Sequence, residues 1–113
     1  KIKKETVSRW GILNIIRKKK YSVQIKDVVE KPSIRNAPSN YAIIGRYILP
    51  KKIMYHLKKQ KPGHDKEVHI TDAIRELIKN GEKFYGNVFK GLYLDCGTLK
   101  GYIESSLKIS RLK

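Results

Sequence analysis

The segment from Tyr41 to Leu49 limits the fold of this chain more than any other part of the sequence. It is apolar at nearly every position apart from Gly45 and Arg46. A half-buried strand alternates apolar and polar residues, whereas a strand covered on both faces is apolar throughout. We therefore predict a central strand over residues 41–49, which needs packed layers on both of its sides.

Further strands are indicated by alternating or short apolar runs at residues 7–12, 21–25 (extended by 28–29), 84–89 and 92–94. Residues 15–20 are interpreted as a hairpin tip. Pro32 and Pro38, among several Ser and Asn residues, predict a loop before the central strand. Strands alternating with helices are typical of the α/β class. The strands are too few for a complete doubly wound domain, so we expect sheet partners to be absent.

Helices are expected at three places in the sequence. Pro50 fits the first turn of one helix. Thr71 or Asp72 can cap a second, and Gly81 stands where a helix end favours a left-handed residue. Thr98 can cap a last helix, whose apolar side we expect to comprise Leu99, Tyr102, Ile103, Ser106 and Leu107.

The composition sets limits on partners. The chain has 113 residues, which suits one small domain or part of a larger one, and a net charge of +16. The cations are scattered, with one tight run at Arg17–Lys20. Since a charge run is usually a solvated face, we do not expect nucleic acid as the partner. No apolar run is long enough to cross a bilayer. The single cysteine, Cys96, favours a cytoplasmic location.

Several segments, in this order, match one known family. They are Val7-Ser8-Arg9-Trp10-Gly11-Ile12, Val28-Val29-Glu30-Lys31-Pro32, Ala37-Pro38-Ser39-Asn40-Tyr41-Ala42-Ile43-Ile44-Gly45-Arg46-Tyr47, Ile70-Thr71-Asp72-Ala73-Ile74, and Leu94-Asp95-Cys96-Gly97 with Gly101-Tyr102. Their order and spacing resemble the C-terminal part of the bacterial UTP–glucose-1-phosphate uridylyltransferases, which are sugar nucleotidyltransferases. The resemblance covers nearly the whole chain.

The resemblance implies a fold and a reaction. Residues 1–113 would be the C-terminal sugar-binding and metal-binding portion of a Rossmann-like nucleotidyltransferase fold, with a mixed sheet and flanking helices. The N-terminal nucleotide-binding portion, with its glycine-rich loop, would then be absent from these residues. In the family, glucose 1-phosphate attacks UTP with the help of Mg²⁺, giving UDP-glucose and pyrophosphate. We expect this chain alone to be inactive, because UTP would bind through the missing half.

The resemblance also implies site residues. Asp95 would hold Mg²⁺, a hard ion that takes few carboxylates together with phosphate oxygens; otherwise it is a helix-capping carboxylate. Lys31 would bind the sugar phosphate as a catalytic residue, with Pro32 biasing its backbone to an extended form. Glu30 would accept hydrogen bonds from glucose hydroxyls. Gly11 would let the sugar approach the backbone closely; otherwise it marks a strand bulge.

Departures from the family leave alternatives open. Thr98-Leu99-Lys100-Gly101 stands where the family usually has Asp-Lys-Leu-Gly, and Trp10 replaces a tyrosine. The chain could be an inactive remnant of a split gene, or, in a different class, a basic nucleic-acid-binding module. A separate N-terminal chain and a homo-oligomer are both open as partners. Arg46 in an apolar strand needs a partner, either a carboxylate or a phosphate.

Overall fold

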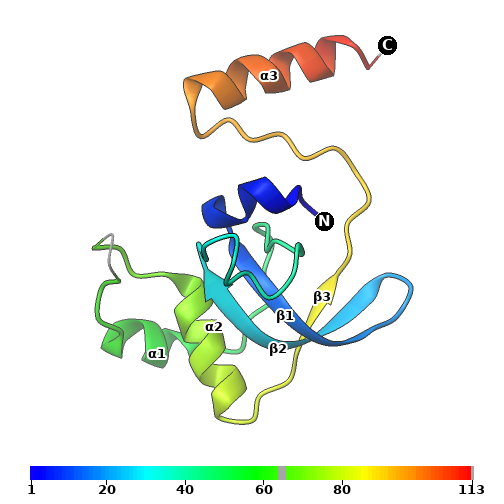
Figure 1. Ribbon diagram of the computed structural model, residues 1–113. Helices are drawn as coiled ribbons and strands as arrows, with labels where there is room; N and C mark the ends of the chain where they lie inside the picture. The colour runs from blue at the N-terminus through cyan, green and yellow to red at the C-terminus, as the bar shows by residue number, and fades with distance from the viewer. Residues whose placement is uncertain (64–65, 113) are drawn as a thin grey trace.

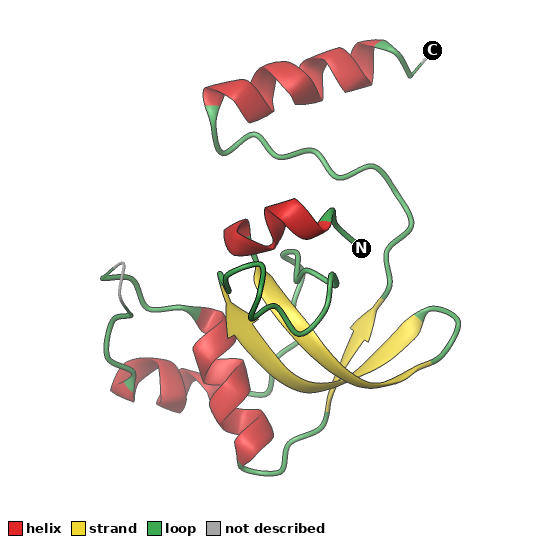
Figure 2. Ribbon diagram, in the orientation of Figure 1, coloured by secondary structure: helices red, strands yellow, loops and turns green. Residues whose placement is uncertain are grey.

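The computed structural model describes residues 1–63 and 66–112. In chain order the elements are the 3₁₀ helix η1 (Lys4–Arg9), β1 (Gly11–Lys18), β2 (Ser22–Glu30), α1 (Ile53–Lys59), α2 (Ile70–Lys79), β3 (Phe84–Asn87) and α3 (Leu99–Ser110). The strands form one antiparallel sheet in the order β1-β2-β3. Helix α2 packs on β2 with α1 beside it, while α3 stands apart at the end of a long connection (Figures 1 and 2). The α/β class is confirmed.

A bulge in β2 decides which side chains face α2. Asn14 pairs with Asp27 and Ile15 pairs with Ile25, so Lys26 has no partner in β1. An unpaired residue shifts the in-and-out alternation of a strand by one. As a result Val28 joins Ile25 in the same core cluster, although the two are three positions apart and would face opposite sides of a regular strand. The shift also brings the end of β2, where the candidate site begins, toward α2.

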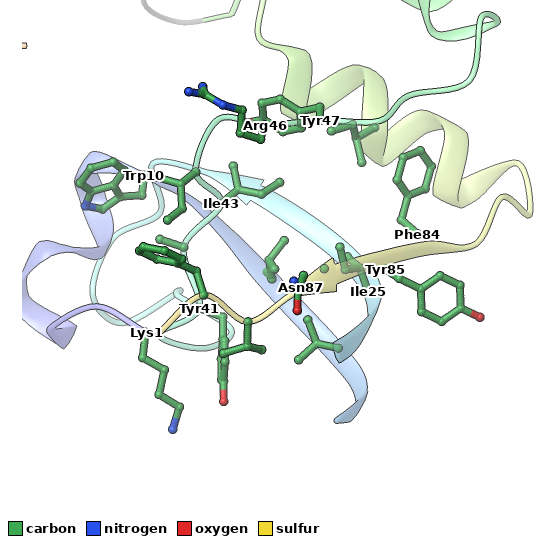
Figure 3. Close-up of a pocket in the computed structure, with 18 of the residues that line it drawn as sticks. Lys1, Trp10, Ile25, Tyr41, Ile43, Arg46, Tyr47, Phe84, Tyr85 and Asn87 are labelled. Carbon is green, nitrogen blue, oxygen red and sulfur yellow. The ribbon is translucent and has the colours of Figure 1, made fainter. Parts of the chain in front are cut away.

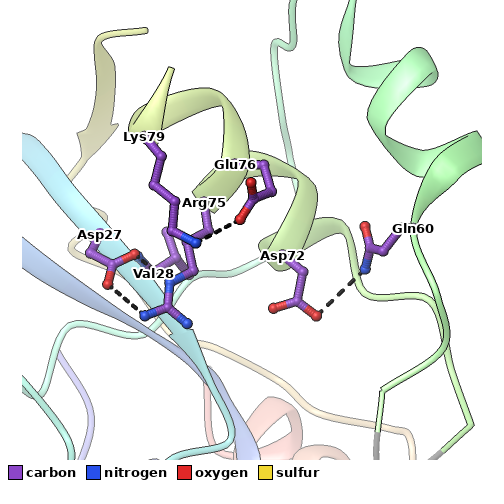
Figure 4. A network of polar contacts seen from close by, with 7 residues as sticks. All are labelled: Asp27, Val28, Gln60, Asp72, Arg75, Glu76 and Lys79. Carbon is purple, nitrogen blue, oxygen red and sulfur yellow. Dashed lines mark hydrogen bonds and ion pairs between the residues drawn. The ribbon is translucent and has the colours of Figure 1, made fainter. Parts of the chain in front are cut away.

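The core lies between the sheet and α2. Its buried members come from both partners, and Ile53 of α1 joins them: Leu13, Val23, Ile25, Val28, Ile53, Ala73, Ile74 and Leu77. An ion pair borders this core (Figure 4): Arg75 Nη2 donates to Asp27 Oδ2 at 3.1 Å, and Arg75 Nε lies 2.9 Å from Asp27 Oδ1. Apolar burial and this ion pair together fix α2 against β2.

The first predicted strand and hairpin tip are misplaced. Residues 4–9 form η1 rather than the start of a strand, because the β1–β2 pairing begins only where Gly11 faces Glu30. Strand β1 then runs to Lys18, so the tip is shorter than predicted and is closed by Lys19 N–H donating to the Ser22 carbonyl at 2.7 Å. The strand predicted over residues 21–25 with its continuation is confirmed as β2.

The prediction of a central strand over residues 41–49 is wrong, because this segment forms no strand in the described structure. The segment makes one bridge to β1, between Ala42 and Ile12, and then leaves the sheet. Arg46 is exposed rather than buried and takes a φ of +154°, and Ile48 is fully exposed at 102%. Residues 92–94, also predicted as a strand, form none. Both segments have strand composition, but the described residues offer them no further strand to pair with.

The helix predictions fare better. Gly81 has a φ of +90° just beyond α2, as predicted, and Thr98 caps α3 by accepting from Gly101 N–H at 3.0 Å. Helix α2, however, begins after His69, so neither Thr71 nor Asp72 is its cap. The apolar side of α3 is exposed, with Leu99 at 77%. Among the described residues no helix combines the length and apolar character needed to cross a bilayer.

The positive φ of Gly81 gives a stability prediction. Because a side chain in this conformation is strained, Gly81→Ala should lower the free energy of unfolding by about 1 kcal/mol, although nothing stands within 4 Å of the added methyl. Gly45→Ala is the matched control, with equally open space and no positive φ. Urea unfolding of both variants measures the difference. Equal stability of the two would contradict the assignment.

Candidate functional site

The carboxylate of Glu30 lies directly over Gly11. The two residues face each other in the β1–β2 register. A Cβ atom on Gly11 would lie 3.0 Å from Glu30 Oε2 and 2.8 Å from Thr71 Cγ2. Only glycine fits such a contact without a shift of its neighbours. Within this chain the space over Gly11 is taken by Glu30 and Thr71, and the approach of a sugar to its backbone stays a prediction.

Thr71 fixes the Glu30 carboxylate. Its Oγ1 donates to Glu30 Oε2 at 2.7 Å, and His69 Nδ1 lies 4.0 Å from Glu30 Oε1. The Glu30 side chain is 20% exposed. Burial, and less strongly the negative charge of Glu30, raise the pKa of the Tyr47 hydroxyl. Glu30 is thus an acceptor held in one orientation by the first turn of α2.

Lys31 does not have the extended backbone that Pro32 was expected to impose. Its φ is +42°, in the left-handed region, and its N–H donates to the Trp10 carbonyl at 3.0 Å. Strand β2 ends at Glu30, so the chain turns at Lys31 while its amide stays bonded to the chain preceding β1. The turn ends the strict alternation of the strand. Glu30 and Lys31 are therefore not obliged to point to opposite faces.

The Asp95 carboxylate is bound by Arg9, two positions before Gly11. Arg9 Nη2 donates to Asp95 Oδ2 at 2.9 Å, and Gly97 N–H donates to Asp95 Oδ1 at 3.1 Å. The rings of Trp10 and Tyr93 pack edge to face with centroids 5.2 Å apart. These contacts join the connection that follows β3 to the chain just before β1.

The predicted site residues therefore meet at one short segment, Arg9–Gly11. Arg9 binds Asp95, Trp10 accepts from the Lys31 amide, and Gly11 faces Glu30. Consecutive Cα atoms are about 3.8 Å apart, so the Cα atoms of Arg9 and Gly11 are separated by about 7.6 Å at most. Three separate parts of the sequence, at Gly11, Glu30–Lys31 and Asp95, are thus brought to one end of the sheet.

These residues lie beside a groove and do not line it. The groove has a volume of about 260 Å³ and is lined by Trp10 and Tyr93, among others, but not by Glu30, Lys31 or Asp95 (Figure 3). Nor do the described residues include a group of three or more His, Cys, Asp or Glu that could hold a metal ion.

Thr71 and Arg9 were missed as site residues by the sequence analysis. Both stand inside matched segments, but Thr71 was interpreted as a helix cap and Arg9 received no role. The sequence did contain a signal for them, because each is a hydrogen-bonding residue within a matched segment. In the structure Thr71 binds Glu30 and Arg9 binds Asp95. What the sequence could not show is that α2 begins early enough for Thr71 to face Glu30.

The basic run Arg17–Lys20 lies at the hairpin tip, at the opposite end of β1 from Gly11. Lys18 and Lys1 both stand over the Tyr41 ring, with Nζ atoms 5.7 and 5.1 Å from its centroid. The hydrogen bond from Lys18, with the charges of both lysines, lowers the pKa of the Tyr41 hydroxyl. Part of the basic charge thus serves local contacts.

The fold and this arrangement place the chain in a class of enzymes. Residues 2–111 match the family described as Nucleotidyl transferase, and the chain belongs to that family.

The relatives that the chain resembles within this class share one activity by name. It is 44% identical over 84 residues to the UTP–glucose-1-phosphate uridylyltransferase of Pseudomonas aeruginosa, and 41% identical over 104 residues to UTP–glucose-1-phosphate uridylyltransferase 2 of Streptococcus pyogenes. These matches cover 74% and 91% of this chain but 30% and 34% of the relatives. The chain therefore spans about a third of the length of these proteins.

A solved structure gives the same result. A UDP-glucose pyrophosphorylase complexed with UDP-glucose superposes with a TM-score of 0.90 at 40% sequence identity. The match covers 99% of this chain and 42% of that one. The expectation that this chain is a partial nucleotidyltransferase fold is confirmed.

The Thr71–Glu30 hydrogen bond gives a second prediction. Thr71→Val keeps the shape but leaves a mostly buried carboxylate short of a donor, so it should lower the free energy of unfolding by about 1–3 kcal/mol. Thr71→Ser keeps the hydroxyl and should lose clearly less. Chemical denaturation of the two variants makes the comparison. A Val variant as stable as the Ser variant would show that the bond does not hold Glu30.

Proposed function

We propose that this chain is the C-terminal sugar-phosphate-binding and metal-binding portion of a uridylyltransferase that makes UDP-glucose and pyrophosphate from UTP and glucose 1-phosphate. The observation that carries the proposal is the meeting of Glu30, Lys31 and Asp95 at the segment Arg9–Gly11. The names of the relatives supply the reaction. The nucleotide-binding portion is proposed to come from outside residues 1–113.

Each residue has a distinct role in this proposal. Glu30, oriented by Thr71, accepts hydrogen bonds from glucose hydroxyls. Lys31 places a positive point charge on the sugar phosphate and so steadies the attacking oxygen next to the α-phosphorus of UTP. Gly11 has no side chain and so leaves room over the β1 backbone for the Glu30 carboxylate. Phosphoryl transfer depends mainly on such positioning and charge stabilisation.

Asp95 is the proposed Mg²⁺ ligand. Mg²⁺ in such enzymes is bound through one or two carboxylates plus substrate phosphates, and Asp95 supplies one carboxylate that is 32% exposed. Its charge is balanced here by Arg9, which would have to release Oδ2 or share it. The donor set of this chain fits one of the ligands and leaves the others to substrate and to the missing portion. When bound, the ion would neutralise charge on the phosphates.

Partners and location follow from the same proposal. Glucose 1-phosphate would contact this chain directly, and UTP would contact the nucleotide-binding portion. That portion belongs to the same polypeptide or to a separate N-terminal chain; a homo-oligomer is a further arrangement that the proposal allows. The cytoplasm is the proposed location, since the one cysteine, Cys96, is free and exposed.

The proposal predicts activity only when both portions are present. We expect no pyrophosphate release from UTP and glucose 1-phosphate by this chain alone. A single polypeptide that joins the N-terminal part of the Streptococcus pyogenes relative to this chain should release pyrophosphate with Mg²⁺. Turnover at ordinary enzyme rates by the isolated chain, or none by the joined protein, would refute the proposal.

The residue roles are tested in the joined protein. Lys31→Ala removes the charge on the phosphate and should lower kcat/KM roughly 100-fold or more. Lys83→Ala, at an exposed lysine between α2 and β3, is the control and should keep the activity of the parent. Asp95→Asn should raise the Mg²⁺ concentration needed for half-maximal rate. If the Lys31 and Lys83 variants behave alike, Lys31 has no special role.

A further inference from the structure

The end of the β1–β2 hairpin carries a dense positive charge. The four consecutive cations Arg17–Lys20 are all exposed. Residues 6–26 contain no Asp or Glu, and neither do residues 83–94, which include the neighbouring strand β3. Within the part of the chain that the structure describes, none of the four cations forms an ion pair. Their charge is therefore available to an anionic partner.

The ring of Tyr21 brings a cation from a second part of the chain to the same place. Val88 N–H donates to the Tyr21 carbonyl at 2.6 Å, so the residues that follow β3 run alongside the hairpin end. The Nζ atoms of Lys20 and Lys90 then stand 5.3 and 5.2 Å from the centroid of the Tyr21 ring. We call residues 16–21, together with Lys90, the basic tip.

An exposed isoleucine lies within the basic tip. The β1–β2 register skips Ile16, which lies between two paired residues of β1. Ile16 is 59% exposed, and Tyr21 at the other end of the tip is 46% exposed. Binding to a bilayer surface strengthens with the apolar area buried among the headgroups and with the attraction of cations to anionic lipids. The basic tip offers both contributions at one place.

The surroundings of the aromatic rings favour phospholipid over nucleic acid as the partner. Proteins that bind single strands stack the bases on open aromatic faces. Here lysines of the chain itself stand over the rings of Tyr21 and Tyr41. A phosphate backbone would also not bury the exposed Ile16, whereas the headgroup region of a bilayer would.

The basic tip lies at the far end of the sheet from the candidate site. It follows the last residues of β1, whereas Gly11 is the first, and a strand of this length spans roughly 20 Å. The hairpin end also projects away from α1 and α2 (Figure 1). A surface that binds the tip therefore need not cover Gly11 or Glu30.

We propose that the basic tip is a membrane-surface contact that binds anionic phospholipids, with its cations on the lipid phosphates and Ile16 among the headgroups. Such a contact is peripheral and needs no helix that crosses the bilayer. The cytoplasmic leaflet of a cell membrane is the anionic one, which agrees with the location proposed above. The contact is independent of the proposed reaction, and it gives a role to charge that the sugar-phosphate site does not use.

Co-sedimentation of this chain with lipid vesicles at physiological salt tests the contact. We expect binding to vesicles of phosphatidylcholine that contain phosphatidylglycerol, and none to vesicles of phosphatidylcholine alone. Combining Arg17→Gln, Lys19→Gln and Lys20→Gln should weaken the binding roughly 100-fold, because each cation near an anionic surface contributes a factor of about five.

A second triple variant controls for the net charge of the whole chain, which is +16. Lys58→Gln, Lys100→Gln and Lys108→Gln together remove the same charge at exposed positions of α1 and α3. This variant should bind the anionic vesicles nearly as well as the parent. All six substituted positions are exposed, so both triple variants should unfold at the temperature of the parent.

Ile16→Ser tests the apolar part of the contact without any change in charge. It should weaken binding to the anionic vesicles roughly 10-fold, since less apolar area is buried among the headgroups. Ile103→Ser, at a 51% exposed position on α3, is the matched control and should bind like the parent.

The outcomes distinguish a lipid contact from its alternatives. Equal losses in the two triple variants would show that only net charge matters, and would overturn the proposal. Unchanged binding by Ile16→Ser, weakened binding by Ile103→Ser, or equal binding to both kinds of vesicle would also overturn it. Binding of single-stranded or duplex DNA that the first triple variant abolishes, with no binding to vesicles, would assign the basic tip to nucleic acid instead.

Discussion

The contact of the Glu30 carboxylate with Gly11 and Thr71 is the constraint on which the rest of the site depends. It joins three elements at one point: the first residue of β1, the last residue of β2 and the first turn of α2. A side chain at position 11 would not fit, and without the Thr71 hydroxyl a mostly buried carboxylate would lack its shortest hydrogen bond. The bulge at Lys26 and the Arg75–Asp27 ion pair bring α2 to this point.

The Asp95 side of the site is attached to the chain just before Gly11. Arg9 and Trp10, just ahead of Gly11, hold Asp95 and Tyr93. The Arg9–Asp95 pair is partly exposed, so its contribution to stability is modest, about 0–1 kcal/mol. The ion pair matters mainly because it holds the Asp95 carboxylate, which lies in the long connection before α3, next to Arg9. A metal ion bound by Asp95, as proposed, would have to compete with Arg9 for the carboxylate.

The sequence predicted local chemistry well and long-range pairing poorly. Gly81 and Thr98 could be placed because a left-handed residue and a helix cap depend on near neighbours only. The matched segments assigned Gly11, Glu30, Lys31 and Asp95 to one family site, which stays a prediction; the structure pairs Gly11 with Glu30 and bonds Asp95 to Arg9. The strand over 41–49 failed because strand formation needs a partner on the far side, and the described chain supplies none. The prediction of an extended backbone at Lys31 failed because the end of the β1–β2 pairing outweighed the preference that Pro32 imposes.

The most direct test of this account is an NMR titration of glucose 1-phosphate into the isotope-labelled chain, assembled with its N-terminal portion and Mg²⁺. The amide signals of Gly11, Lys31 and Gly97 report on the three parts of the site. The account predicts that all three shift with one dissociation constant. Movement of Gly11 and Lys31 with no change at Gly97, or shifts confined to the basic run Arg17–Lys20, would show that the two halves do not form one binding site.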